Sequence, residues 1–123
     1  MVASDTRSSS NITDNTFPLL EQYMNYMLAV QQRSELTMKE YRYDLVMFFR
    51  FIKQEKDRGL CDTPLNKIPI ADIDENFIRK MTTDDLFVFL IYLSRERKAS
   101  AATRARKVAT LKSFFKYLYK KKG

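Results

Sequence analysis

Apolar positions over most of the chain recur every three or four residues, the period that gives an α-helix one apolar face. The first such stretch predicts a helix over about 17–31, with Pro18 in the first turn, where a proline is tolerated. We expect a second helix to open with a capping box, in which the Thr37 side chain accepts from the Glu40 backbone N–H and Glu40 reaches back. This helix should end near Gly59, and its apolar stripe is Tyr41, Leu45, Phe48, Phe49 and Ile52.

The rest of the chain predicts a loop and further helices. Residues 60–75 contain two prolines and isolated polar residues, which favours a loop, and a short helix is expected near 74–80. The apolar run 86–93 follows a Thr-Thr-Asp-Asp helix start and has no visible partner strand. We therefore predict a helix that is buried on most sides and ends near Arg95. Ser100 caps the last predicted helix, whose inward stripe is Val108, Leu111, Phe115 and Leu118 and whose outer face is Arg106, Ser113, Lys116 and Lys120.

These elements predict an all-α fold, a bundle of four to five helices over residues 17–123. The chain holds only two glycines and shows no hairpin signal, so no sheet is expected. Residues 1–16 are rich in Ser, Thr, Asn and Asp, and we expect them to form a mobile tail. A chain of 123 residues, 45% of them hydrophobic, can fill one core, which indicates a single helical domain after the tail.

The composition argues against most forms of catalysis. The chain has no His and a single Cys, Cys61, which excludes a histidine base, a Cys-rich zinc site and an internal disulfide. Of the seven tyrosines, Tyr43 is the one predicted to be exposed, and the others are expected to pack in apolar helix faces. We therefore expect no cofactor and no enzymatic activity in this chain. No apolar run is long enough to span a bilayer and the start lacks a signal-peptide layout, which predicts a cytoplasmic protein.

Positive charge is concentrated at one end of the chain. The net charge is +7, and the last thirty residues hold eleven Lys or Arg side chains against one acid, Glu96. Such a concentration attracts polyanions, nucleic acid more plausibly than an anionic membrane surface. Two clusters lie at predicted helix starts, where unpaired N–H groups and the helix dipole favour phosphate. They are Thr37, Lys39 and Arg42 on the second helix, and Lys98, Ser100, Thr103, Arg104, Arg106 and Lys107 around the start of the last.

Charge alone does not decide whether the basic clusters bind nucleic acid or are only solvated. Arg106 is expected to point away from the core, from where it could reach base edges in a major groove. Basic residues on a helix face are also often only solvated, so charge by itself favours nucleic-acid binding modestly.

Two sequence patterns resemble a known family. Residues 33–52 carry Ser34-x-x-Thr37-x-x-x-Tyr41-x-x-Asp44-Leu45, followed by Phe48-Phe49 and Phe51-Ile52. This stretch is similar to the Ser-x-x-Thr-x-x-x-Tyr-x-x-Asp-Leu…Phe pattern in the N-terminal domain of tyrosine recombinases. Residues 100–119 resemble the last helix of the same domain. The two patterns occur in the right order at a compatible distance, and the resemblance covers about residues 17–122.

The resemblance implies a SAM-like core-binding domain of a bacterial or phage-type integrase, which forms one jaw of a clamp around DNA. The starts of the second and last helices would face the major groove and its flanking phosphates, and Lys112 matches a position that is usually basic. The implied partners are double-stranded DNA at a recombination site and other recombinase protomers in a synaptic complex. We expect no membrane partner and a monomeric isolated domain. The DNA-binding candidates are Thr37, Lys39, Arg42, Lys98, Ser100, Thr103, Arg104, Arg106, Lys107 and Lys112.

The catalytic residues of that family belong to a second domain, which we expect this chain to lack. Its His-containing box cannot be hidden in a chain without His, so we expect a domain or a truncated product of a longer recombinase, without strand cleavage. A protein-interaction module is the alternative. In that hypothesis exposed side chains dock a partner helix and the basic end only keeps the protein soluble. The residues concerned are Met24, Met27, Met47 and Phe51.

Overall fold

The computed structural model describes residues 15–122, and the side chains as far as Lys120. The helices are α2 (Pro18–Ala29), α3 (Glu35–Lys56), α4 (Glu75–Arg79), α5 (Thr83–Arg95) and α6 (Ala101–Lys122), with the short 3-10 turns η1 (Arg58–Leu60) and η2 (Leu65–Lys67). No strand occurs within this described range, and the predicted all-α fold is confirmed. The predicted tail 1–16 lies outside the described residues, apart from Asn15 and Thr16.

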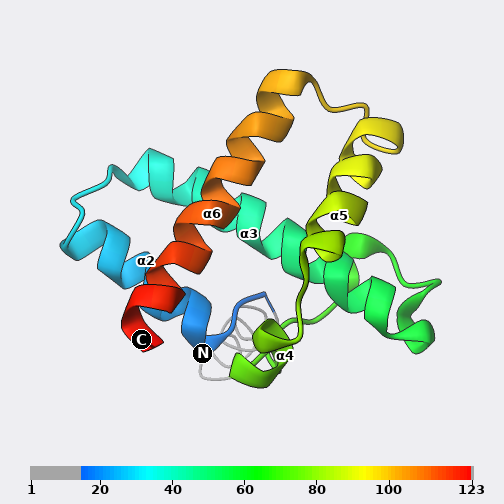
Figure 1. Cartoon of the computed structure of the whole chain (residues 1–123), viewed down its shortest axis with the longest axis horizontal. Coiled ribbons are helices and arrows are strands. Elements are labelled where there is room, and N and C mark those ends of the chain that lie inside the picture. The colour runs from blue at the N-terminus through cyan, green and yellow to red at the C-terminus, as the bar shows by residue number, and fades with distance from the viewer. Residues whose placement is uncertain (1–14, 123) are drawn as a thin grey trace, which may run out of the picture.

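The long helix α3 runs through the middle of the molecule, and α2, α5 and α6 all pack against it (Figure 1). Helix α6 crosses α3 and also contacts α2 and α5. Aromatic rings fill the space between these helices and meet mostly edge to face, an arrangement that the charge distribution of aromatic rings favours. The core therefore lies around the middle of α3, and the rings that meet there are Tyr23, Phe48, Phe49, Phe89 and Phe114.

Side-chain caps fix where the helices begin. The predicted capping box of Thr37 and Glu40 is wrong, because α3 begins at Glu35 and the Ser34 Oγ accepts from the Thr37 backbone N–H at 3.1 Å. Ser34 has extended backbone and a hydroxyl, so it caps the helix before Thr37 can. The predicted cap at Ser100 is confirmed, since its Oγ accepts from the Thr103 N–H at 3.1 Å. Helix α5 has a complete capping box of Thr82 and Asp85.

Helix α5 is less buried than its sequence predicts. The apolar run does form a helix that ends at Arg95, but the prediction that it is buried on most sides is wrong. On this helix only Phe89 and Leu93 are buried, whereas Phe87, Val88 and Ile91 are 54%, 41% and 53% exposed. The reason is that α5 packs against α3 and α6 and no described helix covers its other side.

The inward face of α6 is rotated from the predicted one. The prediction holds for Leu111 and Leu118, but Val108 and Phe115 are only half-buried. Ser113, expected on the outer face, is half-buried and shares a hydrogen bond with the Tyr23 hydroxyl at 2.8 Å. Burial and this hydrogen bond have opposite effects on the pKa of Tyr23, and burial, the larger, raises it above its ordinary value. The described side chains buried on α6 are Lys107, Thr110, Leu111, Phe114 and Leu118.

The segment between α3 and α5 packs against the C-terminal end of α3. The expected loop is present, with η1 and η2 inside it, and the expected short helix is α4, capped by Asp74. Ile68, Ile70 and Ile73 of this loop are buried. The Gln54 side-chain amide donates to two loop carbonyls, and the Arg50 Nε donates to the carbonyl of Ile68 at 3.2 Å. These bonds satisfy loop carbonyls where the chain has no regular partner.

Candidate nucleic-acid interface

The N-terminal halves of α3 and α6 meet at one corner of the molecule. We call this surface the α3–α6 corner and define it as residues 37–44 of α3, the connection 96–100 and residues 101–107 of α6. Three ion pairs join the two helices: Lys107 Nζ to Asp44 Oδ1 at 2.7 Å, Arg106 Nη2 to Asp44 Oδ1 at 3.2 Å, and Arg106 Nη1 to Glu40 at 3.9 Å. These ion pairs place basic residues of α6 against acids of α3, whereas Lys39 and Arg42 of the basic α3 cluster line a cleft with Glu21 of α2.

The ion pair of Asp44 and Lys107 is buried inside this corner. Asp44 is 1% exposed and Lys107 is 4% exposed. The Thr110 hydroxyl donates to the second carboxylate oxygen of Asp44 at 3.2 Å, and the Lys107 ammonium lies 4.9 Å from the centre of the Tyr43 ring. Lys107 was a predicted DNA-binding residue, and the structure places its charge in the core, where it neutralises Asp44.

Arg106 lies at the edge of the corner and not on the side opposite the core. Its side chain is 41% exposed and its guanidinium is turned toward the two acids of α3. The rotation of α6 described above accounts for this position, because it brings Arg106 next to α3. A half-exposed guanidinium can exchange an acid for a phosphate.

The candidates on α3 face different neighbours. Lys39 is exposed, while the Arg42 guanidinium pairs with Glu21 of α2 at 2.6 Å. The hydrogen bond from Arg42 is the main reason why the pKa of Glu21 lies below its ordinary value. The Thr37 hydroxyl accepts from the Ser34 hydroxyl at 2.9 Å. Of these candidates, Lys39 is the one with a charge that no described acid neutralises.

The candidates at the start of α6 are partly used for capping. Ser100 and Thr103 bond to each other through their hydroxyls at 3.1 Å, and Arg104 Nη1 donates to the Ala99 carbonyl at 2.6 Å. Lys98 is exposed, with a positive φ of 52°. Lys112 is exposed as well, but it lies farther along α6, where it lines a cleft with Phe48 and Thr82. Lys112 therefore lies outside the α3–α6 corner.

Two residues that were not among the sequence candidates belong to this surface. Tyr43, predicted and found to be exposed, lines a cleft of about 130 Å³ together with Arg50 and Arg97. Arg97 comes from the connection between α5 and α6, and its place beside α3 depends on how that connection turns. Exposure of Tyr43 could be predicted from its position, whereas the neighbourhood of Arg97 has no signal in the sequence.

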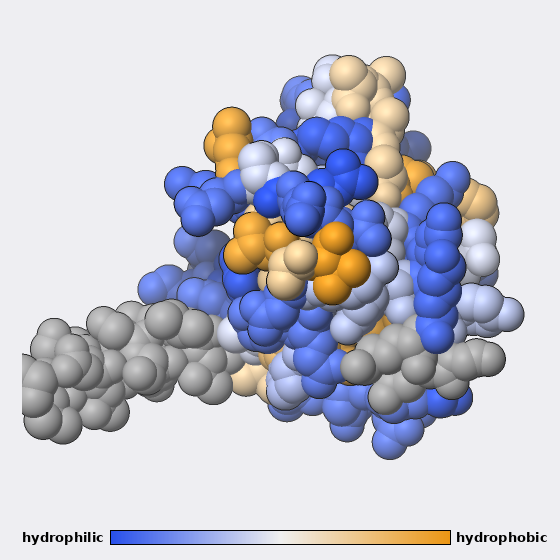
Figure 2. Space-filling model, turned by 90° about the vertical axis from the view of Figure 1, so that its left-hand side faces the viewer, coloured by the Kyte–Doolittle hydropathy of each residue, from blue (hydrophilic) through white to orange (hydrophobic). Residues whose placement is uncertain are grey.

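The neighbouring end of the molecule, where α2 turns into α3, is mainly hydrophilic. Figure 2 shows, near the centre of this end, a small hydrophobic group surrounded by hydrophilic residues. Leu28, Val30 and Leu36 are the large apolar residues exposed in this turn. The residues that the interaction-module hypothesis requires on the surface are all buried, which contradicts its premise. They are Met24, Met27, Met47 and Phe51.

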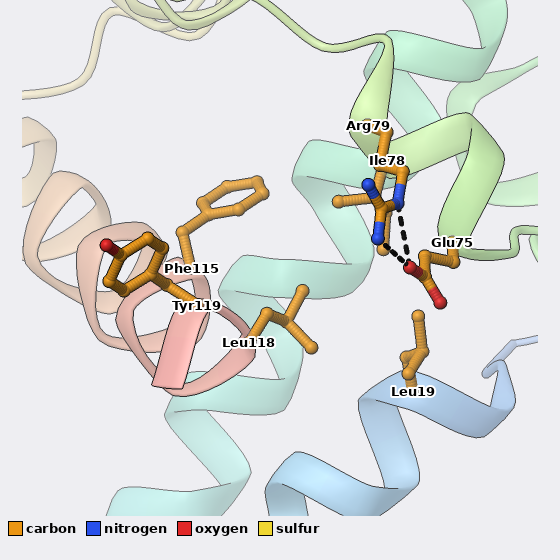
Figure 3. A pocket seen from close by; sticks show the side chains of 7 residues that line it. All are labelled: Leu19, Glu75, Ile78, Arg79, Phe115, Leu118 and Tyr119. Atoms are coloured by element: carbon orange, nitrogen blue, oxygen red, sulfur yellow. Dashed lines mark hydrogen bonds and ion pairs between the residues drawn. The ribbon is translucent and has the colours of Figure 1, made fainter. Parts of the chain in front are cut away.

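A larger cleft lies at the other end of α6. It has a volume of about 370 Å³ and is lined by residues of α2, α4 and the C-terminal part of α6 (Figure 3). Its lining is apolar except for Glu75 and Arg79, which form an ion pair along α4. Tyr119 borders the cleft and is 78% exposed, so the prediction that it packs in the core is wrong. This cleft is separate from the basic corner.

Neither a metal site nor a membrane helix is found in the described part of the chain. No three His, Cys, Asp or Glu side chains gather there closely enough to hold a metal ion. None of the described helices is long and apolar enough to cross a membrane. Cys61 is a free, exposed thiol.

Comparison with known proteins identifies the family. The family model described as "Phage integrase, N-terminal SAM-like domain" matches residues 19–122, which include all of the α3–α6 corner. The chain belongs to this family. The SAM-like domain is 42% identical over 104 residues to the tyrosine recombinase XerC of Caldanaerobacter subterraneus subsp. tengcongensis, covering 85% of this chain and 30% of that protein.

Two further relatives carry the same name. The SAM-like domain is 31% identical over 99 residues to tyrosine recombinase XerC of Herpetosiphon aurantiacus, covering 80% of this chain and 26% of that protein. It is 27% identical over 103 residues to tyrosine recombinase XerC of Anoxybacillus flavithermus, covering 84% and 28%. The SAM-like domain thus spans less than a third of the length of these curated relatives. No solved structure matches it.

Proposed function

We propose that this SAM-like domain binds duplex DNA at a recombination site, as the N-terminal DNA-binding part of a tyrosine recombinase. The observation that carries the proposal is that the N-terminal halves of α3 and α6 are joined at the α3–α6 corner, where the basic side chains of Lys39, Lys98 and Arg106 are exposed. The family supports it, because the relatives are named tyrosine recombinases, and a recombinase acts on DNA. Strand cleavage is not part of the role proposed for this chain.

The corner offers two kinds of contact to a duplex. The exposed ammonium groups of Lys39 and Lys98 can contact phosphates, as can the free N–H groups at the start of α6. The Arg106 guanidinium can exchange its partly exposed partner Glu40 for a phosphate or a base edge, since such ion pairs are worth little in water. We include Tyr43 and Arg97, the residues that the sequence did not mark, in the proposed interface.

The proposal extends to contacts with other recombinase protomers. The exposed face of α5, formed by Phe87, Val88 and Ile91, is an apolar surface that the described part of the chain leaves uncovered. Contiguous exposed apolar residues often mark a surface for another protein. Such contacts would appear as more than one copy of the chain per duplex in the titration described next.

Fluorescence anisotropy of the chain with a labelled duplex of mixed sequence tests the proposal, with salt varied over roughly 50–200 mM. We expect binding that weakens steeply with salt, because each phosphate contact releases counterions. Arg106→Ala should weaken binding about tenfold. Arg58→Ala, which removes an exposed arginine at the far end of α3, should change it less than about twofold. Absence of binding at the lowest salt would overturn the proposal and favour a protein partner.

A further inference from the structure

Helix α6 has two possible inward faces. Its apolar stripe of Val108, Leu111, Phe115 and Leu118 defines one of them. The structure uses another, which includes Lys107, Thr110 and Phe114. The centres of the two faces differ by roughly 60°, if each residue turns the helix by about 100°. Hydrophobicity alone favours the first face, because the second brings a lysine and a threonine into the core. An interaction outside α6 must therefore select the second.

Asp44 of α3 supplies that interaction. Its carboxylate is 1% exposed and accepts from Lys107 at 2.7 Å and from Thr110 at 3.2 Å. No described side-chain polar atom in the core lacks a hydrogen-bond partner. Turning α6 to its apolar stripe would carry Lys107 and Thr110 away and leave a buried carboxylate without them. The cost of a buried charge without partners exceeds what a half-buried valine and phenylalanine would gain.

We propose that Asp44 and Lys107 are positioning residues that fix the rotation of α6 and so place Arg106 at the α3–α6 corner. This inference rests on the proposed DNA binding. In the observed rotation, the Arg106 guanidinium lies 3.2 Å from Asp44 and 3.9 Å from Glu40, on the side of α6 that adjoins α3. On the alternative face, Arg106 would point directly away from the core and from α3. The pair thus determines which basic residues share one surface, and Lys107 acts from inside the protein.

A charge-neutral double variant separates positioning from stability. Asp44→Leu with Lys107→Met removes the ion pair, leaves the net charge of the chain unchanged and keeps the volume at position 107. Thr110 retains its hydrogen bond to the Arg106 carbonyl at 3.1 Å, so its hydroxyl stays paired. Apolar residues often replace a buried ion pair without loss of stability, so we expect a melting temperature within about 5 °C of the parent chain. The matched control is Asp72→Leu with Lys53→Met, which removes the 2.6 Å ion pair of those residues outside the corner.

Nuclear Overhauser effects report the rotation without any DNA. The Tyr23 hydroxyl lies 2.8 Å from the Ser113 Oγ, and the Phe49 and Phe114 rings lie 5.7 Å apart. Cross-peaks between Tyr23 and Ser113 and between Phe49 and Phe114 should be present in the parent and in the control. We expect both to weaken or disappear in the Asp44→Leu/Lys107→Met chain. Their persistence at full intensity would overturn the inference.

DNA binding gives the second measurement. Arg106→Ala should weaken binding about tenfold in the parent and control chains, and less than about twofold in the Asp44→Leu/Lys107→Met chain. Equal losses in all three chains would overturn the proposed positioning of Arg106. If no chain binds DNA, the proposed function fails, while the cross-peaks still decide whether the pair sets the rotation.

A single variant keeps the inference testable if the double variant does not fold. In Asp44→Ala, Lys107 loses its partner and can extend its ammonium to solvent when α6 turns. We expect the same two cross-peaks to weaken in this chain. Unchanged cross-peaks would show that α6 keeps its rotation without the carboxylate, and would overturn the inference.

Discussion

Lys107 serves the core although it belongs to the most basic part of the sequence. Its neighbours Arg104 and Arg106 lie at the surface or its edge, and only its position on α6 distinguishes it from them. A lysine is rarely buried unless it is paired, and Asp44 provides that pair across two helices. The sequence contains both residues, but their contact joins positions sixty-three residues apart, which spacing within one helix cannot reveal.

We expect Lys107→Met to destabilise the domain by about 3 kcal/mol, because it leaves the Asp44 carboxylate buried without its closest cation. The methionine keeps the volume of the side chain, so the loss reports the charge. Urea unfolding monitored by circular dichroism measures this free energy. Lys112→Met, the same substitution at an exposed position of α6, should change the free energy of unfolding by less than about 0.5 kcal/mol. Similar values for the two variants would contradict a buried ion pair.

The first residues of two helices show how far the local sequence can predict where a helix begins. Ser100 was predicted as the cap of the last helix and is confirmed, because no competing hydroxyl or acid precedes it closely. At α3, Ser34 and Thr37 are both capping residues, and the pattern alone favoured Thr37 because a glutamate follows three residues later. The structure uses Ser34, which lets α3 begin two residues before Thr37.

This difference at α3 leads to a stability prediction. Ser34→Ala should lower the free energy of unfolding by about 1 kcal/mol, because the Thr37 N–H loses its acceptor at 3.1 Å. Thr37→Ala should cost clearly less, since Thr37 lies inside the first turn and its hydroxyl bonds only to Ser34. Thermal unfolding of both variants compares them directly. A larger loss in Thr37→Ala would indicate that the helix begins at Thr37 in solution.

The sequence predicted which helices are present more completely than it predicted which face of each helix is buried. The presence and type of the five described helices could be predicted from apolar spacing and caps, because these signals are local. Burial of α5 was overestimated, since an apolar run does not show how many neighbours will cover it. The rotation of α6 was missed because a polar pair, and not the apolar stripe, selects the inward face. The candidate site shows the same difference between local signals, which could be predicted, and contacts between elements, which could not. Its basic helix starts could be predicted, but not the burial of Lys107 or the position of Arg97.

At the scale of the whole molecule, the fold places basic residues of α3 and α6 at one corner, away from the exposed apolar surfaces. The chain carries +7 overall, and the all-helical packing brings the N-terminal halves of α3 and α6 together at one corner. The apolar cleft beside Tyr119 and the exposed face of α5 lie elsewhere on the molecule. A polyanion approaching this protein therefore meets a localised field, and association should depend on where the positive charges are as well as on their number.

Two variants of equal net charge test whether location matters. Lys39→Gln with Lys98→Gln removes two exposed charges from the α3–α6 corner, and Lys67→Gln with Lys80→Gln removes two exposed charges from η2 and the end of α4. Figure 1 shows α4 at the opposite end of the molecule from the start of α6.

We expect the corner variant to bind a mixed-sequence duplex at least about tenfold more weakly than the parent. The slope of its log affinity against log salt concentration should be reduced by nearly two, because two phosphate contacts are lost. The second variant should lose only about twofold and keep its slope, since it changes the general field alone. Anisotropy titrations at several salt concentrations measure both quantities. Equal losses in affinity and slope would mean that DNA responds to net charge and not to the corner.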